Sequence, residues 1–406
     1  MTESERNKLR EAVYTGALFS SHEHYYDLSG EPSIDVNTLI SNSYLDEEWT
    51  FLGPGTDAET RTTFLSSLRS KSYLRWFGES LQTLYGVSKP LSVENWNEYD
   101  QRISEMRSGR GFLRDVYTKH CLYECIVQDS YWSPAEMPQE FDFFRATFRI
   151  NSFLYSYSRS SEDHNGNNAR RLYGFDTNDI DEYVQHMESA IAEKMESGCV
   201  ALKSALAYDR PIGFEKVDKS MAARVLKKSQ PSEKEIRLFG DYIFHQICGI
   251  AQERGIPFQI HTGLGLLWGS SPMNFEPVIR AYPGLSFVLF HGGYPWTHVI
   301  GGLLHNYSNV HADLVWLPLI SPTAAINALH EWLEVSNSIY RLEWGSDCKT
   351  PEESYGATLA FRNVLFTVLS QKIEAGYFDL HTAQQIARLI GLENANALYL
   401  GKEVEA

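Results

Sequence analysis

The stretch Ala17–Tyr25 reads ALFSSHEHY, an apolar run that ends in two histidines separated by one residue. In an extended segment side-chain direction repeats every second residue, so His22 and His24 point to one side and Glu23 to the other. Two imidazoles on one side of a strand can hold a single metal ion. Because an H-x-H pattern also arises by chance, its meaning depends on the rest of the chain.

Strand-like runs recur along the chain, with helical periodicity between most of them. The runs cover residues 17–24, 124–129, 145–150, 199–204, 257–261, 286–291, 309–315 and 342–347. Strand and helix that alternate in this way favour a closed parallel barrel over an open sheet. We therefore predict an α/β fold, a (β/α)8 TIM barrel that forms a single domain over residues 1–406.

Two connections are longer than ordinary loops. Residues 45–120, after the first strand, carry Trp, Tyr and Leu at helical spacing, which predicts a helical insertion. Residues 152–176 are polar and predict a mobile loop. Both follow strands, so both should lie on the rim that carries barrel active sites, and we expect the insertion to supply aromatic residues to the pocket. Amphipathic helices are predicted around residues 358–369, 381–390 and 394–400.

Composition narrows the class of partner. The chain has 406 residues and a formal net charge of −16, which argues against nucleic acid or an anionic membrane as partner. The start of the chain is polar, and no apolar run approaches the roughly 18 residues of a spanning helix. Five scattered cysteines suit reduced thiols. We expect a cytoplasmic protein with a small-molecule substrate; a homo-oligomer stays open.

Further candidate ligands stand at the ends of later strand-like runs: Lys203, His261, His291 and Asp347. Barrel active sites are built from such strand ends, so these side chains should converge with the two histidines of the first strand. Imidazole and carboxylate suit a divalent metal such as zinc. Taken singly, a histidine could bond to backbone and Asp347 could cap a helix. Lys203 at the end of a buried strand requires a partner, a shifted pKa or chemical modification.

Four motifs together resemble the amidohydrolase superfamily, in its amidohydrolase-2 branch: FSSHEH at 19–24, IHTG at 260–263, FHGG at 290–293 and GSD at 345–347. The early insertion and Lys203 in LKSALAY resemble the subgroup related to the N-terminal domain of fungal FluG proteins. The resemblance covers nearly the whole chain. It implies a distorted (β/α)8 barrel that binds one or two divalent metals, most often zinc, with manganese as an alternative.

The resemblance also implies roles for the candidate ligands. Its two-metal form uses His22, His24 and Asp347 for one ion, His261 and His291 for the other, and Lys203, carboxylated by CO2, as the bridge. In its one-metal form His22, His24, His261 and Asp347 bind the ion, while His291 polarises the substrate. Lys203 favours the two-metal form, and the one-metal form stays open.

The reaction that the resemblance implies is a hydrolysis in which an activated water attacks a carbonyl carbon. Asp347 takes the proton of that water and returns it to the leaving group. We predict hydrolysis of an amide or related C–N bond in a small, carboxylate-bearing molecule. A metal-dependent decarboxylase or other C–C lyase, a uronate-type isomerase and a non-catalytic module that keeps the barrel remain alternatives.

The substrate side of the site is less defined in the sequence. Arg149 and Arg210 could bind a substrate carboxylate through paired hydrogen bonds, or form structural salt bridges. Aromatic residues that follow strands could line the pocket or pack in the core: Tyr25, Tyr208, Trp268 and Trp316.

Overall fold

The computed structural model describes residues 1–28, 31–52, 57–107, 110–129 and 141–404. Within these ranges eight parallel strands pair in chain order. They are β1 (Leu18–Glu23), β2 (Tyr123–Gln128), β3 (Phe144–Arg149), β4 (Cys199–Ser204), β5 (Phe258–Ile260), β6 (Phe287–Leu289), β7 (Val310–Asp313) and β8 (Leu342–Glu343). Each predicted run overlaps its strand, so the predicted (β/α)8 barrel is confirmed.

The barrel closes where the segment after β8 meets β1. The Ser21 N–H donates to the Trp344 carbonyl at 3.1 Å, and the Asp347 N–H donates to the His22 carbonyl at 2.9 Å. A Cβ at Gly345 would lie only 2.6 Å from Ser21 Oγ, so the close approach of the two backbones requires glycine there. The closure therefore places Asp347 directly beside the two histidines of β1.

Strand side chains fill the barrel interior. Phe19, Val127, Ala201 and Val288 belong to one buried cluster with Tyr399 of α19 (Asn394–Leu400). The Tyr399 ring stacks on Phe19 at 5.8 Å, so α19 covers the end of the barrel where β1 begins. The interior is a packed core and not a channel. Polar groups at the strand carboxyl ends consequently face the opposite opening.

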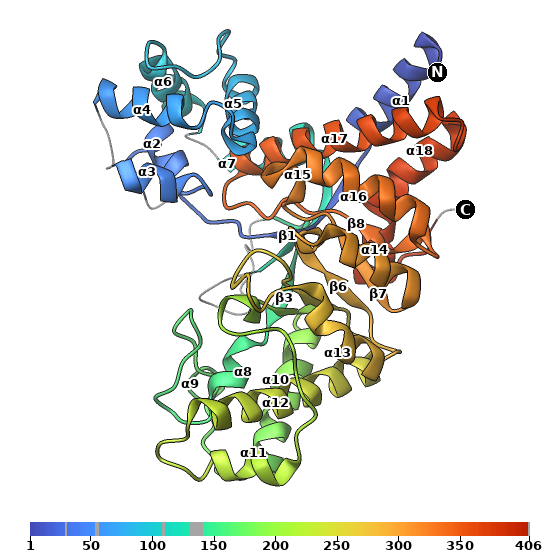
Figure 1. Ribbon diagram of the computed structural model, residues 1–406. Coiled ribbons are helices and arrows are strands. Elements are labelled where there is room, and N and C mark those ends of the chain that lie inside the picture. Colours follow the sequence, from blue (N-terminus) through green and yellow to red (C-terminus); the bar gives the residue numbers. More distant parts are fainter. Residues whose placement is uncertain (29–30, 53–56, 108–109, 130–140, 405–406) are drawn as a thin grey trace.

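Helices surround the strands (Figure 1). They are α1 (Glu3–Thr15), α10 (Ile180–Glu196), α11 (Lys219–Val225), α12 (Glu233–Arg254), α13 (Glu276–Ala281), α14 (Thr297–Asn306), α15 (Leu317–Ile320), α16 (Pro322–Val335), α17 (Pro351–Glu374) and α18 (Leu380–Arg388). One apolar face of α12 is buried, and a Ser232–Glu235 capping box begins this helix. Among the helices described, none has the length and apolarity needed to cross a membrane.

The insertion after β1 is helical, and Figure 1 shows α2–α6 as a lobe beside the barrel. Its helices are α2 (Val36–Ser41), α3 (Asp46–Leu52), α4 (Ala58–Ser67), α5 (Ser72–Tyr85), α6 (Trp96–Met106) and α7 (Arg110–Asp115). A buried ion pair joins the lobe to α17, because Arg107 Nε lies 2.7 Å from Glu352 Oε1. The Tyr85 hydroxyl donates to the same oxygen at 2.6 Å. The lobe is therefore fixed beside the segment that follows Asp347.

The polar segment 152–176, predicted above as a mobile loop, contains part of α8 (Asn151–Tyr155) and all of α9 (Ala169–Leu172). Asn168 and Arg170 are buried. The Asn168 side chain caps α9, and Arg170 Nε donates to the Ser156 carbonyl at 2.8 Å. The prediction of a loop is thus wrong for these residues, because their polar side chains satisfy local backbone groups and form short helices.

Candidate metal centre

The histidines of the opening stretch lie together at the carboxyl end of β1. Their ring centroids are 4.7 Å apart, and both side chains are buried. His24 Nδ1 donates to the Asp129 carbonyl oxygen at 2.8 Å, which leaves the lone pair on Nε2. That nitrogen lies 3.1 Å from Asp347 Oδ1. As predicted, Glu23 points away, toward the hydroxyls of Ser20 and Ser354.

Asp347 faces three imidazoles. Its Oδ1 lies 3.8 Å from His22 Nε2, and its Oδ2 lies 3.7 Å from His291 Nδ1. Asp347 and His291 both have φ near +60°, a left-handed conformation that is uncommon for residues other than glycine and that clusters at functional sites. The helix after Asp347 is capped by Thr350, so capping does not explain this carboxylate.

Asp129, which the sequence reasoning did not select, completes the cluster. Its Oδ2 lies 3.6 Å from His22 Nε2. Ligand atoms of His22, His24 and Asp129 all lie within 4.8 Å of one another, and all three residues are buried. Asp129 ends the second predicted strand run, as Asp347 ends the eighth. Its position was therefore a signal that the same strand-end argument could have used.

The donor set fits a divalent metal ion. Both ring nitrogens of His22 and Oδ1 of Asp347 are buried and have no hydrogen-bond partner among the residues described. Buried polar groups are costly without a partner, so such atoms point to a ligand. Burial holds the pKa of His22 well below its usual value, and Lys203 and His24 lower it further. The imidazole is therefore neutral, as metal binding requires.

His261 and His291 form a second pair beside Asp347. Their ring centroids are 4.2 Å apart, and His291 Nε2 lies 2.9 Å from His261 Nδ1. His261 Nε2 bonds to the Leu264 carbonyl, and His291 Nδ1 lies 3.2 Å from the Val315 carbonyl. Burial holds both pKa values well below the usual one. The structure thus brings the two predicted ligands together and gives both of them protein partners.

Lys203 is buried among these residues at the end of β4. Its Nζ lies 3.7 Å from the centre of the Phe290 ring, and no hydrogen bond or ion pair joins it to the described part of the chain. Burial lowers the pKa of Lys203 to about 7, although Asp129 and Asp347 act against that shift. The neutral amine is therefore well populated near pH 7.

The two arginines have carboxylate partners within the protein. Arg149 pairs with Asp129 and also donates to Asn165 at 3.0 Å, so it belongs to the metal cluster rather than to an open rim. Arg210 pairs with the buried Asp241 of α12 and is not brought to the cluster.

The four aromatic candidates occupy different places. Tyr208 lies 4.5 Å from His261, and Trp316 lies 5.5 Å from His291, so both line the opening above the histidines. Tyr25 is buried against Tyr117 and Phe144 and packs in the core. Trp268 is 74% exposed and lines a separate hollow.

The insertion contributes to the wall around Trp316. Trp316 Nε1 donates to the Tyr73 hydroxyl at 2.7 Å, and the Tyr44 ring lies 4.9 Å from the indole. Trp316 also has a φ of +63°, a strained conformation for so large a residue. Aromatic side chains from the lobe therefore pack against Trp316, which in turn lies beside His291. That the insertion lines the substrate pocket stays a prediction.

Residues 218–400 match the family model described as Amidohydrolase. This region, a little under half of the chain, holds His261, His291 and Asp347 and is similar to the amidohydrolase superfamily. Protein fluG of Emericella nidulans is 30% identical to this chain over 220 residues, which are 49% of this chain and 25% of that protein. The matched region thus spans about a quarter of that protein.

Solved structures resemble this chain along almost its whole length. A uronate isomerase from Thermotoga maritima has a TM-score of 0.79 at 16% identity, with 98% of each chain covered. A Lactobacillus casei protein described as a metal-dependent hydrolase has a TM-score of 0.69 at 17% identity, with 97% of each chain covered. At these identities the likeness concerns the fold.

Proposed function

We propose that this protein is an enzyme of the amidohydrolase superfamily, a metal-dependent hydrolase of an amide or related C–N bond in a small, carboxylate-bearing molecule. One observation carries the proposal. The Asp347 carboxylate faces His22 and His24 through Oδ1 and His291 through Oδ2. A carboxylate between a metal cluster and a second polar pair can take a proton from water on one side and deliver it to a leaving group on the other.

The ion would be held by His22, His24 and Asp347, with Asp129 as a further oxygen ligand. These nitrogen and oxygen donors suit zinc, and manganese is the alternative. When bound, the ion supplies a Lewis acid that polarises a carbonyl and lowers the pKa of water. A second ion would require His261 and His291 to exchange their present hydrogen bonds for the metal, with carboxylated Lys203 between the two sites.

The other residues of the opening have positioning roles in this proposal. His291 Nε2 bonds to His261, so their rings hold each other in place next to the carboxylate that moves the proton. Tyr208 and Trp316 provide apolar faces that limit water around the reacting bond. The Arg149 guanidinium balances the charge of Asp129, so two carboxylates can coexist in the buried cluster.

The test is metal content together with turnover on a substrate panel. We expect at least one equivalent of divalent metal per chain and release of amine from N-acyl amino acids. His24→Ala should lose both. Release of CO2 from aromatic acids, or isomerisation of uronates without amide hydrolysis, would replace the hydrolase proposal by one of those reactions. A chain without metal after growth with added zinc or manganese would contradict the enzyme proposal.

A further inference from the structure

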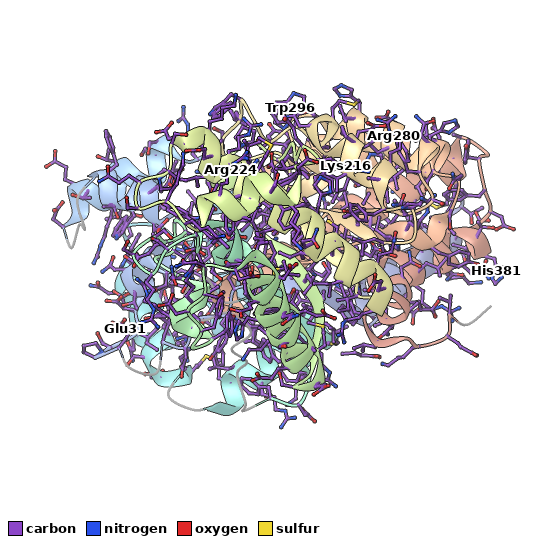
Figure 2. The ribbon with its side chains drawn as sticks, turned by 90° about the horizontal axis from the view of Figure 1, so that it is seen from below. Glu31, Lys216, Arg224, Arg280, Trp296 and His381 are labelled. Atoms are coloured by element: carbon purple, nitrogen blue, oxygen red, sulfur yellow. The ribbon has the colours of Figure 1, made fainter. Side chains whose placement is uncertain are left out.

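A second hollow lies between α12 and α13, and none of its lining residues belongs to the metal cluster. It encloses about 590 Å³, a size suited to a small molecule. Three cationic side chains from three different elements line it: Lys216 before α11, Arg237 on α12 and Arg280 on α13. Figure 2 labels Lys216 and Arg280 near each other on one face of the molecule.

The cationic side chains are largely uncompensated. In the described part of the chain, Lys216 and Arg237 form no ion pair. Arg280 Nε faces the Glu276 carboxylate at 3.7 Å, and that group already accepts a hydrogen bond from the Tyr307 hydroxyl. Glu215 also lines the hollow. On a chain with a net charge of −16, such a local excess of positive charge favours an anionic ligand.

The floor of the hollow is apolar and held in place. Phe214 stacks in parallel on Phe244 with ring centroids 3.7 Å apart. The Glu215 N–H donates to Asp241 Oδ2 at 3.3 Å, which fixes the segment after Phe214 to α12. On α12, His245 Nδ1 lies 2.9 Å from the Tyr282 hydroxyl. These contacts preform the hollow, so a ligand would lose little free energy in ordering it.

We propose that this hollow binds a small organic anion, with its phosphate or carboxylate between Lys216, Arg237 and Arg280. The apolar body of the anion packs on Pro277 and on the edge of the Phe214 ring, since Phe244 stacks on that ring and the Arg210 guanidinium lies over it at 4.8 Å. Arginine and lysine side chains recognise such groups through charge-assisted hydrogen bonds, and the Phe214 edge and Pro277 offer apolar contact to an aromatic or aliphatic body. The proposal concerns a site separate from the metal centre and does not depend on the reaction there.

Calorimetric titration of the full chain with phenyl phosphate at low salt tests the site. Titration with benzoate shows whether a carboxylate binds as tightly as the phosphate. Titration with phenol shows how much of the affinity comes from the apolar ring alone. Lys216→Gln with Arg280→Gln should weaken phenyl phosphate binding about tenfold or more. The control pair Arg224→Gln with Lys227→Gln changes the net charge equally, lies on or beside α11 and should bind like the parent. Ala281→Trp should block binding by filling the hollow without a charge change.

Three results would overturn the proposal. The first is no binding of phenyl phosphate or benzoate to the parent chain. The second is equal weakening by the Lys216/Arg280 pair and by the control pair, which would indicate nonspecific attraction. The third is binding that His24→Ala abolishes while the hollow variants retain it, which would place the anion at the metal centre. Circular dichroism of each variant verifies folding. If Ala281→Trp does not fold, the Lys216/Arg280 variant alone decides the test.

Discussion

Arg149 holds the Asp129 carboxylate at two points inside the barrel, with Nη2 2.5 Å from Oδ2 and Nε 3.1 Å from Oδ1. Both side chains are almost fully buried. Asp129 in turn faces His22 with its carboxylate and accepts from His24 with its backbone carbonyl. The Arg149–Asp129 ion pair therefore orients both His22 and His24. Arg149 binds a carboxylate of the protein itself and not one of a substrate.

The first prediction concerns this pair. Asp129→Asn keeps the shape of the side chain but removes the charge, so Arg149 stays buried without a counter-ion. We expect metal affinity to fall about 10–100-fold. The free energy of unfolding should fall by about 3–5 kcal/mol. Competition with a chelator measures the first quantity, and urea unfolding measures the second.

Arg210 and Asp241 provide a matched control, because they form a buried ion pair outside the metal cluster. Asp241→Asn should destabilise the fold to a similar degree and leave metal affinity unchanged. If both variants lost metal affinity equally, the loss in Asp129→Asn would reflect a general destabilisation of the fold. The assignment of Asp129 as a metal ligand would then be wrong.

How much of the site could be predicted from the sequence depends on whether its contacts join residues close together or far apart in the chain. The period-2 argument on His22 and His24 is local, and strand ends share one opening in any parallel barrel, so the cluster followed from the eight runs. The role of Arg149 depends on β2 lying beside β3, where Gln128 pairs with Ala146. A barrel with its strands in chain order places β2 beside β3, but no local pattern in the sequence shows that the Arg149 and Asp129 side chains meet. A strand-end arginine thus suggested a substrate contact equally well.

Backbone geometry at the site was also outside the reach of the sequence. Trp316 has positive φ, although residues of its size rarely do, and Asp347 shares this conformation. Intrinsic backbone preference favours negative φ at such positions. Only the closure of the barrel imposes the positive φ. The helices in segment 152–176 arise in the same way, since buried contacts of Asn168 and Arg170 override a polar composition.

The second prediction is a pH dependence of stability. Burial raises the pKa of Glu353 to about 7, where it accepts the backbone N–H groups of Tyr44 and Lys349. Between the unfolded value near 4.5 and 7, the folded protein binds this proton and the unfolded chain does not. Glu353 therefore contributes stability that is lost as pH rises through this window, by at most about 1.4 kcal/mol per pH unit.

Urea unfolding of the metal-free chain from pH 4.5 to 7.5 measures this slope. Glu353→Gln cannot titrate, so its stability should fall less steeply with pH than that of the parent. The exposed Glu3→Gln serves as the control and should follow the parent. Parallel curves for Glu353→Gln and the parent would show that this carboxyl is ionised in the folded protein across the whole window.

The third prediction tests the wall supplied by the insertion. Tyr73→Phe removes the hydroxyl that accepts from Trp316 Nε1, and Trp316 lines the opening beside His291. Loss of one hydrogen bond of about 1 kcal/mol should raise KM roughly fivefold, with little change in kcat. The exposed Tyr377→Phe should leave both constants unchanged. A fall in kcat with KM unchanged would mean that Tyr73 acts on the chemical step instead.

The last prediction concerns Lys203, whose Nζ is buried over the Phe290 ring without an ion-pair partner in the described residues. A neutral amine can react with CO2, and the carbamate would carry the negative charge that two metal ions require between them. Lys203→Ala should therefore lose activity and the second equivalent of metal, and short carboxylic acids should partly restore both. Lys203→Arg should resist rescue, because its larger, permanently charged group fills the space. Elemental analysis and turnover measure these effects. Full metal content and turnover in Lys203→Ala would exclude the bridge and leave the one-metal form.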